Sequence, residues 1–211
     1  MKNIFITATN TDIGKTHATI LLIKELSLKG YKVGVLKPIE TGVTNLPLDG
    51  QKLYNTAMKF NKDVDITIQD VVPITFSLPS APYVAKGNTS IDFEKILRAY
   101  KKIASQSDIV LIEGAGGLMV PVEKDFYMID FIKIFDAKTL LVTPNSLGCI
   151  NDTLLSLNLL KQHNLSHLWC INHFNSNKES FKKVTLPFYK ENFDEVLSLQ
   201  DDLEMIIKRL L

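Results

Sequence analysis

The stretch Thr7-Ala8-Thr9-Asn10-Thr11-Asp12-Ile13-Gly14-Lys15-Thr16 decides the fold, because it ends as a phosphate-binding loop ends. Lys2 to Ala8 is typical of a short buried strand, and Thr16 to Lys29 is typical of an amphipathic helix. In such a unit, backbone N–H groups and the helix N-terminus converge on an anion, while the lysine reaches the outer phosphates and the threonine hydroxyl binds Mg²⁺. The sequence therefore predicts a protein that handles a nucleoside triphosphate.

The loop lacks the early glycine of a standard phosphate-binding loop. Five residues before Gly14 the chain has Thr9, and Ala8 stands one position earlier. The alternative interpretation is a Gly-Lys-Thr tripeptide that occurs by chance at the start of a helix. The strand before it and the helix after it favour the phosphate-binding interpretation.

Composition predicts a single globular domain over residues 1–211, since 45% of the residues are hydrophobic and 22% are charged. Lysine and arginine number 24 against 23 acidic residues, so nothing draws the whole molecule to nucleic acid or to an anionic membrane. Cys149 and Cys170 have no paired spacing, which argues against a disulfide framework or a zinc site. No apolar run approaches the roughly 20 residues of a membrane helix, and we expect a cytoplasmic protein.

Short apolar runs alternate with longer amphipathic ones, which predicts an α/β fold with a mainly parallel sheet and helices on both faces. Strands are expected at Asn3 to Ala8, Lys32 to Lys37, Asp108 to Glu113, Lys138 to Thr143 and Leu168 to Asn172, with a sixth near Val71 to Phe76. Helices are expected at Lys15 to Lys29, Gln51 to Asn61, Ile91 to Gln106, Met128 to Phe135, Asn151 to His163 and Asp201 to Leu211. Ligands bind at the carboxyl ends of such strands, so the loops that follow them should form one site.

Two charged residues end strands that should border this site. Glu113 is followed by Gly114-Ala115-Gly116-Gly117, so its carboxylate can hold Mg²⁺ opposite Thr16. The alternative is a solvated acid before a glycine turn. Lys37 should point into the same crevice as Lys15 and add a second ammonium group around the anions, although a lysine at a strand end is often only a surface residue.

Two further segments are ambiguous from their residues alone. Asp49 lies in the predicted loop between the second strand and the next helix, where an aspartate is usually a turn or N-cap residue. Leu147 to Asn151 opens a helix, whose N–H groups and dipole suit a carboxylate, yet an ordinary helix start fits equally well. Cys149 is not expected to be a nucleophile, because no base can be placed beside it.

Four segments taken together resemble dethiobiotin synthetase, in the same order along the chain. They are Thr9 to Thr16, Lys37-Pro38-Ile39-Glu40-Thr41-Gly42, Glu113 to Gly117 and Leu147-Gly148-Cys149-Ile150-Asn151. The resemblance extends from Met1 to about Asn172, and only the four segments jointly are specific. It implies a P-loop NTPase-like sheet of about seven strands and a homodimer. It also implies an ATP- and Mg²⁺-dependent enzyme that closes a cyclic urea on 7,8-diaminononanoate with carbon dioxide to give dethiobiotin.

The resemblance also implies roles for individual residues. Those that would bind Mg²⁺ are Thr16, Asp49 and Glu113. Those that would surround the nucleotide are Asp12, Ile13, Gly14, Lys15, Thr16, His17, Asp49, Glu113, Gly114, Ala115, Gly116 and Asn172. Lys15 and Lys37 would be catalytic and flank the reacting anions. Thr11, Lys37 and Thr41 would contact the diamine or its carbamate, while Gly148, Cys149, Ile150 and Asn151 of the neighbouring subunit would hold the substrate carboxylate.

The chain also departs from the family pattern. Ala8 stands where the family usually has glycine, and His173 follows Asn172 where the family usually has aspartate in a base-reading segment. Ala8 bears on how closely the backbone approaches phosphate, whereas few residues from Asn172 onward can read a base edge, so we expect loose selectivity for the nucleotide base.

Three alternatives remain open. A dimeric switch ATPase would carry a signature lysine at the position of Asn10. A corrin-amidating synthase would usually need a glutamine-hydrolysing domain, for which the chain has no room. A catalytically silent nucleotide-binding protein is the third, and only activity can exclude it.

Overall fold

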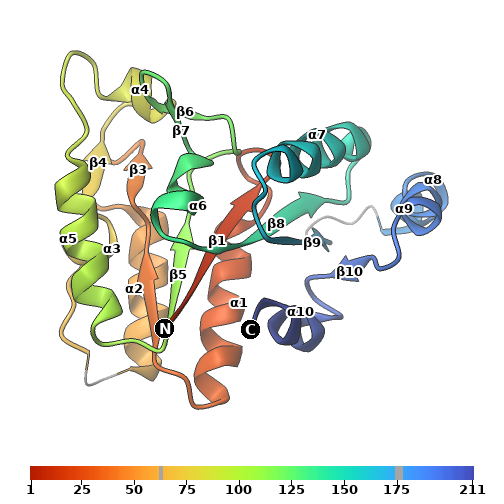
Figure 1. Cartoon of the computed structure of the whole chain (residues 1–211), viewed down its shortest axis with the longest axis horizontal. Helices are drawn as coiled ribbons and strands as arrows, with labels where there is room; N and C mark the ends of the chain where they lie inside the picture. The colour runs from red at the N-terminus through yellow and green to blue at the C-terminus, as the bar shows by residue number, and fades with distance from the viewer. Residues whose placement is uncertain (62–63, 174–177) are drawn as a thin grey trace.

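The computed structural model describes residues 1–61, 64–173 and 178–211. Within them the main sheet has six strands, all parallel, in the order β10-β9-β8-β1-β5-β2 (Figure 1). These strands are β1 (Lys2–Ala8), β2 (Val33–Leu36), β5 (Ile109–Glu113), β8 (Lys138–Pro144), β9 (His167–Asn172) and β10 (Leu197–Ser198). Two small two-stranded sheets are formed by β3 (Ile39–Thr41) with β4 (Ile74–Phe76) and by β6 (Pro121–Glu123) with β7 (Phe126–Tyr127).

Strand β1 lies inside the sheet, between β5 and β8. It is buried from Ile4 to Ala8, and β5 is buried along its whole length, as expected for parallel strands that are covered on both faces. In the register of the sheet, Ile6 lies opposite Glu113 and Ala8 lies opposite Val142. The segment that follows Ala8 therefore leaves the sheet beside the end of β5.

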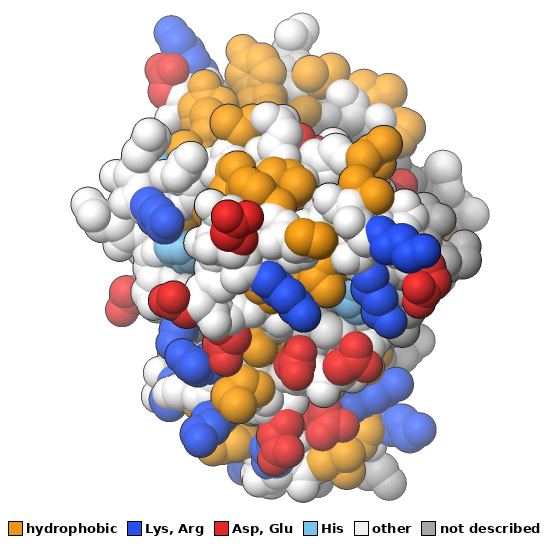
Figure 2. All heavy atoms as spheres, turned by 90° about the vertical axis from the view of Figure 1, so that its right-hand side faces the viewer, with side chains coloured by type: hydrophobic (Ala, Val, Ile, Leu, Met, Phe, Trp, Pro, Cys, Tyr) orange, Lys and Arg blue, Asp and Glu red, His pale blue; other side chains and the backbone are white. Residues whose placement is uncertain are grey.

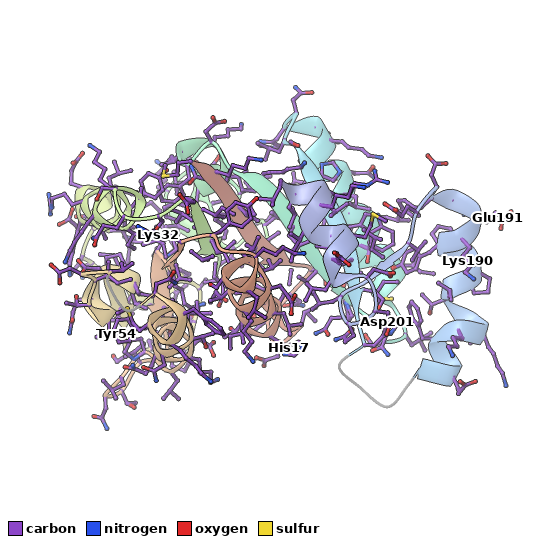
Figure 3. All side chains as sticks on the ribbon, turned by 90° about the horizontal axis from the view of Figure 1, so that it is seen from below. His17, Lys32, Tyr54, Lys190, Glu191 and Asp201 are labelled. Carbon is purple, nitrogen blue, oxygen red and sulfur yellow. The ribbon has the colours of Figure 1, made fainter. Side chains whose placement is uncertain are left out.

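Helices flank the sheet, as Figures 1 and 3 show. They are α1 (Lys15–Leu28), α2 (Leu48–Phe60), α3 (Ile68–Val71), α4 (Pro82–Ala85), α5 (Phe93–Ala104), α6 (Asp130–Ile134), α7 (Cys149–Gln162), α8 (Lys178–Val184), α9 (Leu186–Asn192) and α10 (Leu203–Leu210). Helix α1 packs against β1 and β5 and contacts α2 and α10, whereas α5 packs against β2 and β5. The predicted α/β fold is confirmed.

The sixth predicted strand, Val71 to Phe76, is only partly correct. Val71 ends the short helix α3, and the strand is limited to β4, which pairs with β3 outside the main sheet. The helix forms because Thr67 and Asp70 make a capping box, in which the Asp70 N–H donates to the Thr67 hydroxyl and the Thr67 N–H donates to the Asp70 carboxylate. Among the described residues the main sheet has six strands, close to the about seven that the resemblance implied.

Helix α2 begins earlier than predicted. It starts at Leu48 instead of Gln51, so Asp49 lies in its first turn and not in a loop. This corrects the predicted position of a candidate metal ligand and brings it onto a regular element. The helix predicted from Asn151 likewise begins at Cys149, directly after Gly148.

The sequence did not predict α8, α9 or β10. Figure 3 shows α9, with Lys190 and Glu191, at one end of the molecule, away from the helix α1 that carries His17. Tyr189 of α9 is fully buried, and its ring lies 5.0 Å from that of Trp169 on β9. Aromatic packing therefore attaches this segment to the sheet.

The face seen in Figure 2 carries both acidic and basic side chains, with hydrophobic side chains between them. No helix in the described part of the chain has the length and apolar character to cross a bilayer.

Both cysteines should be unreactive in the folded protein. Cys149 is 2% exposed and Cys170 is fully buried, and burial raises the pKa of both thiols, that of Cys170 to about 12. A disulfide reagent such as Ellman's reagent at pH 8 should therefore label neither thiol until denaturant is added. Native labelling above about a tenth of one equivalent would contradict this burial.

Candidate functional site

The loop between β1 and α1 bends through two residues with left-handed backbone. Asp12 has φ of 59° and Gly14 has φ of 105°, and the Gly14 carbonyl accepts the first helical hydrogen bond, from the Ala18 N–H at 2.9 Å. Helix α1 therefore begins directly at Lys15. Its first N–H groups have no intrahelical partners and face the loop with the positive end of the helix dipole, which makes the loop suited to bind phosphate.

Asn172, at the end of β9, contacts the loop on its side toward β9. Its Nδ2 donates to the Ile13 carbonyl at 2.8 Å, and its Oδ1 accepts from Gln200 Nε2 at 2.5 Å. The structure thus places this predicted nucleotide ligand against the loop, where its amide is already bonded. His173 follows it, but residues 174–177 of the expected base-reading segment lie outside the described residues.

We expect Gly14→Ala to weaken nucleotide binding at least about tenfold, because a Cβ at Gly14 would lie 2.2 Å from Asn172 Nδ2 and the backbone there is left-handed. Gly30→Ala is the matched control, since Gly30 also has a positive φ, of 91°, but has open space around it. Calorimetric titration with ATP should show wild-type affinity for the control. Equal affinity of both variants would show that the contact with Asn172 does not hold the loop.

A buried ion pair lies beside the loop. Lys37 follows β2 and its Nζ donates to Glu113 Oε1 at 2.8 Å, with the two side chains 5% and 0% exposed. Burial alone would lower the pKa of Lys37, but the charge of Glu113 and its hydrogen bond outweigh burial and raise that pKa. The lysine is therefore held in its charged form.

Two hydroxyls from α1 complete the contacts of the Glu113 carboxylate. Thr16 Oγ1 donates to Oε1 at 2.9 Å, and Thr19 Oγ1 donates to Oε2 at 2.8 Å. The structure thus brings Thr16, Lys37 and Glu113 together as predicted, and adds Thr19, which the sequence analysis missed. The signal was available, because Thr19 lies one turn after Lys15 on the same helix face.

Lys15 is the second cation at this point. It is 8% exposed, and its Nζ donates to the Asn10 carbonyl within the loop at 3.0 Å. Burial and the nearby positive charge of Lys37 lower the pKa of Lys15 to about 8. Both predicted ammonium groups therefore line the same cleft, and the charge of Lys37 disfavours the charged form of Lys15.

The opposite wall is formed by β3 and the start of α2. Glu40 is 8% exposed and accepts the N–H groups of Asp49 and Gly50 at 3.1 and 2.8 Å. Burial raises the pKa of Glu40, an effect that these two donors and the charge of Lys37 oppose. Asp49 itself is partly exposed and forms an ion pair with Lys52 at 3.1 Å.

These walls enclose a cleft of about 860 Å³. The predicted residues that line it are Thr11, Asp12, Gly14, Lys15, Thr16, His17, Lys37, Thr41, Asp49, Glu113, Ala115 and Gly116. Residues that line it without having been predicted are Ile20, Glu40, Lys52, Pro79, Ser80, Ala81, Pro82 and Val120. The Pro79–Pro82 segment reaches the cleft because β3 and β4 pair, with the Gly42 N–H donating to the Leu78 carbonyl at 3.3 Å. That pairing could not be read from the sequence.

Several predicted residues do not line this cleft. Ile13 is part of the loop itself, and Asn172 binds its carbonyl oxygen. Gly114 lies close to the ring of Phe5 and to the side chain of Met128. Gly148 and the first residues of α7, Cys149, Ile150 and Asn151, do not line the cleft either, and Leu147 before them is exposed. Within one copy of the chain, the expected carboxylate-binding segment is thus separate from the cleft.

The donor set in the cleft fits a hard divalent cation. The Thr16 hydroxyl and one Glu113 oxygen are in hydrogen-bond contact, and Asp49 contributes a partly exposed carboxylate to the opposite wall. Among the described residues no group of three or more His, Cys, Asp or Glu side chains could hold a metal ion. Mg²⁺ commonly uses one or two carboxylates together with phosphate oxygens and water, so these oxygen ligands suit a magnesium ion that arrives with the nucleotide.

Comparison with known proteins identifies the family. A family model described as an AAA domain matches residues 2–196. The ATP-dependent dethiobiotin synthetase BioD of Sulfurovum sp. (strain NBC37-1) is 46% identical over 211 residues, which cover all of both chains. The chain belongs to the dethiobiotin synthetase family. Another dethiobiotin synthetase, from Wolinella succinogenes, is 35% identical over 213 residues, covering 100% of this chain and 99% of the relative.

Solved structures with the same fold include a plasmid partition protein and a cell division complex. A plasmid partition protein from Borrelia burgdorferi superposes with a TM-score of 0.61 at 14% identity, covering 99% of this chain and 98% of that one. The MinC:MinD cell division complex of Aquifex aeolicus gives 0.53 at 20% identity, covering 99% and 86%. At these identities the likeness concerns the fold alone, and the dethiobiotin synthetase sequences determine the family.

Proposed function

We propose that this chain is an ATP-dependent dethiobiotin synthetase, which closes the cyclic urea of dethiobiotin on 7,8-diaminononanoate with carbon dioxide. The observation that carries the proposal is the meeting of Lys15, Lys37, Thr16 and Glu113 at one end of a single cleft. Family membership supplies the reaction, and this cluster supplies the charges that the reaction needs.

In this mechanism one substrate amine captures carbon dioxide as a carbamate, whose oxygen attacks the γ-phosphorus of ATP. ADP leaves, and a carbamic–phosphoric anhydride remains. The second amine then attacks the carbonyl carbon, expels phosphate and closes the ring. Carbamate and triphosphate are both anions, so their approach costs Coulomb energy that fixed cations must offset.

Different residues of the cleft bind the phosphates, the carbamate and the metal in this mechanism. The loop N–H groups and Lys15 bind the phosphates, while Lys37, held charged by Glu113, lies beside the attacking anion. Thr41 and Thr11 line the cleft, where they would orient the diamine or its carbamate. Thr16, Asp49 and Glu113 would hold Mg²⁺, which neutralises phosphate charge when it is bound.

We further propose a homodimer in which the N-terminus of α7 binds the substrate carboxylate of the neighbouring subunit. The N–H groups at the start of this helix suit a carboxylate, and the helix begins outside the cleft of its own chain. A second copy could place it over the cleft. Sedimentation at micromolar concentration should therefore give twice the mass of one chain.

The deciding experiment supplies diamine, bicarbonate, Mg²⁺ and ATP, and follows dethiobiotin by mass spectrometry together with phosphate release. Dethiobiotin and phosphate should appear in equal amounts. Phosphate release without diamine would instead favour a switch ATPase, and neither product would indicate a silent nucleotide-binding protein. Asn10 stands where such a switch would have its signature lysine, which weighs against that alternative.

We expect the base of the nucleotide to be selected weakly. Asn172 does not line the cleft, and its Nδ2 donates to the Ile13 carbonyl while its Oδ1 accepts from Gln200, so its amide is held against the loop and not presented to a base edge. Titration with ATP, GTP and CTP should give affinities within about a hundredfold of one another, or ~2.7 kcal/mol. A stronger preference for ATP would contradict weak selection.

A further inference from the structure

Helix α2 begins without a capping side chain of its own. Its N-cap residue is Pro47, which has no side-chain acceptor, and its first turn contains Asp49 and Gly50. The first N–H groups of a helix have no partner within it, so acceptors must come from elsewhere.

Glu40, which lies on β3, supplies these acceptors from its side chain. Its Oε1 accepts the Asp49 N–H at 3.1 Å, and its Oε2 accepts the Gly50 N–H at 2.8 Å. The side chain is 8% exposed, so both of its oxygens are committed to the helix start. A carboxylate at this end of a helix is also favoured by the helix dipole.

The first turn of α2 is packed too closely against its neighbours to move freely. A Cβ at Gly50 would lie 2.0 Å from Val72 Cγ2 and 3.2 Å from Glu40 Oε2. The Asp49 N–H is thus bonded to Glu40, and the next residue, Gly50, is packed tightly against Val72. Its side chain remains 44% exposed and lines the cleft.

We propose that Glu40 is a positioning residue, whose carboxylate fixes the first turn of α2 and thereby holds the Asp49 carboxylate on the cleft wall for the magnesium–nucleotide complex. This inference rests on the proposed function, which assigns Asp49 to the metal. Without Glu40 the first turn of α2 loses two acceptors, so Asp49 samples more positions and metal binding costs more conformational entropy.

The test compares ATP binding by calorimetry with Mg²⁺ and with EDTA, in the absence of diamine. Glu40→Ala should weaken binding of the magnesium complex about tenfold, or ~1.4 kcal/mol, and binding of metal-free ATP less than about threefold. Glu40→Gln should lose less, because one acceptor oxygen remains. The matched control is Asp92→Ala, which removes a cap from α5, where Asp92 accepts the Lys95 N–H at 2.8 Å, and should leave both affinities unchanged.

A double variant separates positioning from a general loss of stability. If Glu40 acts through Asp49, Glu40→Ala/Asp49→Asn should bind the magnesium complex no more weakly than Asp49→Asn alone. Additive losses, or an equal loss in EDTA, would overturn the proposal. Unchanged magnesium dependence of ATP binding in Asp49→Asn would also overturn it, because Asp49 would then not be a metal ligand. A wild-type protein that makes no dethiobiotin but shows the expected binding pattern would overturn the proposed reaction and leave the role of Glu40 standing.

Discussion

Replacing Lys37 with alanine should reduce turnover at least ~100-fold, in the range of losing one preorganised electrostatic group, while ATP affinity changes less than about threefold. The reason is position: Lys37 lies against Glu113 and not within the phosphate-binding loop, so it serves the reacting anions more than the resting nucleotide. Steady-state rates of dethiobiotin formation, together with calorimetric ATP titration, measure the two quantities separately.

The same strand offers a matched control. Lys32 is exposed immediately before β2, whereas Lys37 is buried immediately after it. Lys32→Ala should retain turnover within about twofold. Near wild-type rates for Lys37→Ala would remove the catalytic role of Lys37. Equal losses in turnover and in ATP affinity would instead make it a nucleotide-binding residue.

Glu113→Ala should lower the free energy of unfolding by about 3–5 kcal/mol, because it leaves the buried Lys37 ammonium without its partner. Urea denaturation followed by circular dichroism measures this loss. An exposed pair provides the control: Glu204 lies 3.4 Å from Lys29 with its side chain 89% exposed, so Glu204→Ala should cost less than about 1 kcal/mol.

The double variant Lys37→Met/Glu113→Leu should recover most of the stability, because it removes both charges and fills their space with apolar atoms. It should remain inactive. Such a result would show that the pair is retained for chemistry at the expense of stability. If the double variant were less stable than Glu113→Ala, the burial of Lys37 would not be the cause of the loss.

The sequence predicted most of the elements that carry the cleft. The loop, β5 with Glu113, and β2 with Lys37 were placed correctly, because a buried parallel strand is a short apolar run that its loop residues delimit. The carboxyl-end rule then predicted that the loop, Lys37 and Glu113 would meet. The overall fold and the centre of the cleft therefore follow from local patterns.

What the sequence did not predict depends on contacts between distant segments. The start of α2, and with it the position of Asp49, depends on acceptors from Glu40, and Pro47 gives no local cap signal. The Pro79–Pro82 wall depends on the pairing of β3 with β4. The capping box of Thr67 and Asp70, in contrast, is a local pattern that the sequence itself contains.

The register of β1 determines when it can form its hydrogen bonds. Lys2 pairs with Ile109 and Ala8 pairs with Val142, so both neighbours of β1 are synthesised long after it. At about 5–20 residues per second, roughly 7–27 seconds of translation separate β1 from the last of these partners. During that interval its apolar side chains have no strand beside them, and the nascent segment that carries β1 is where a ribosome-associated chaperone should bind.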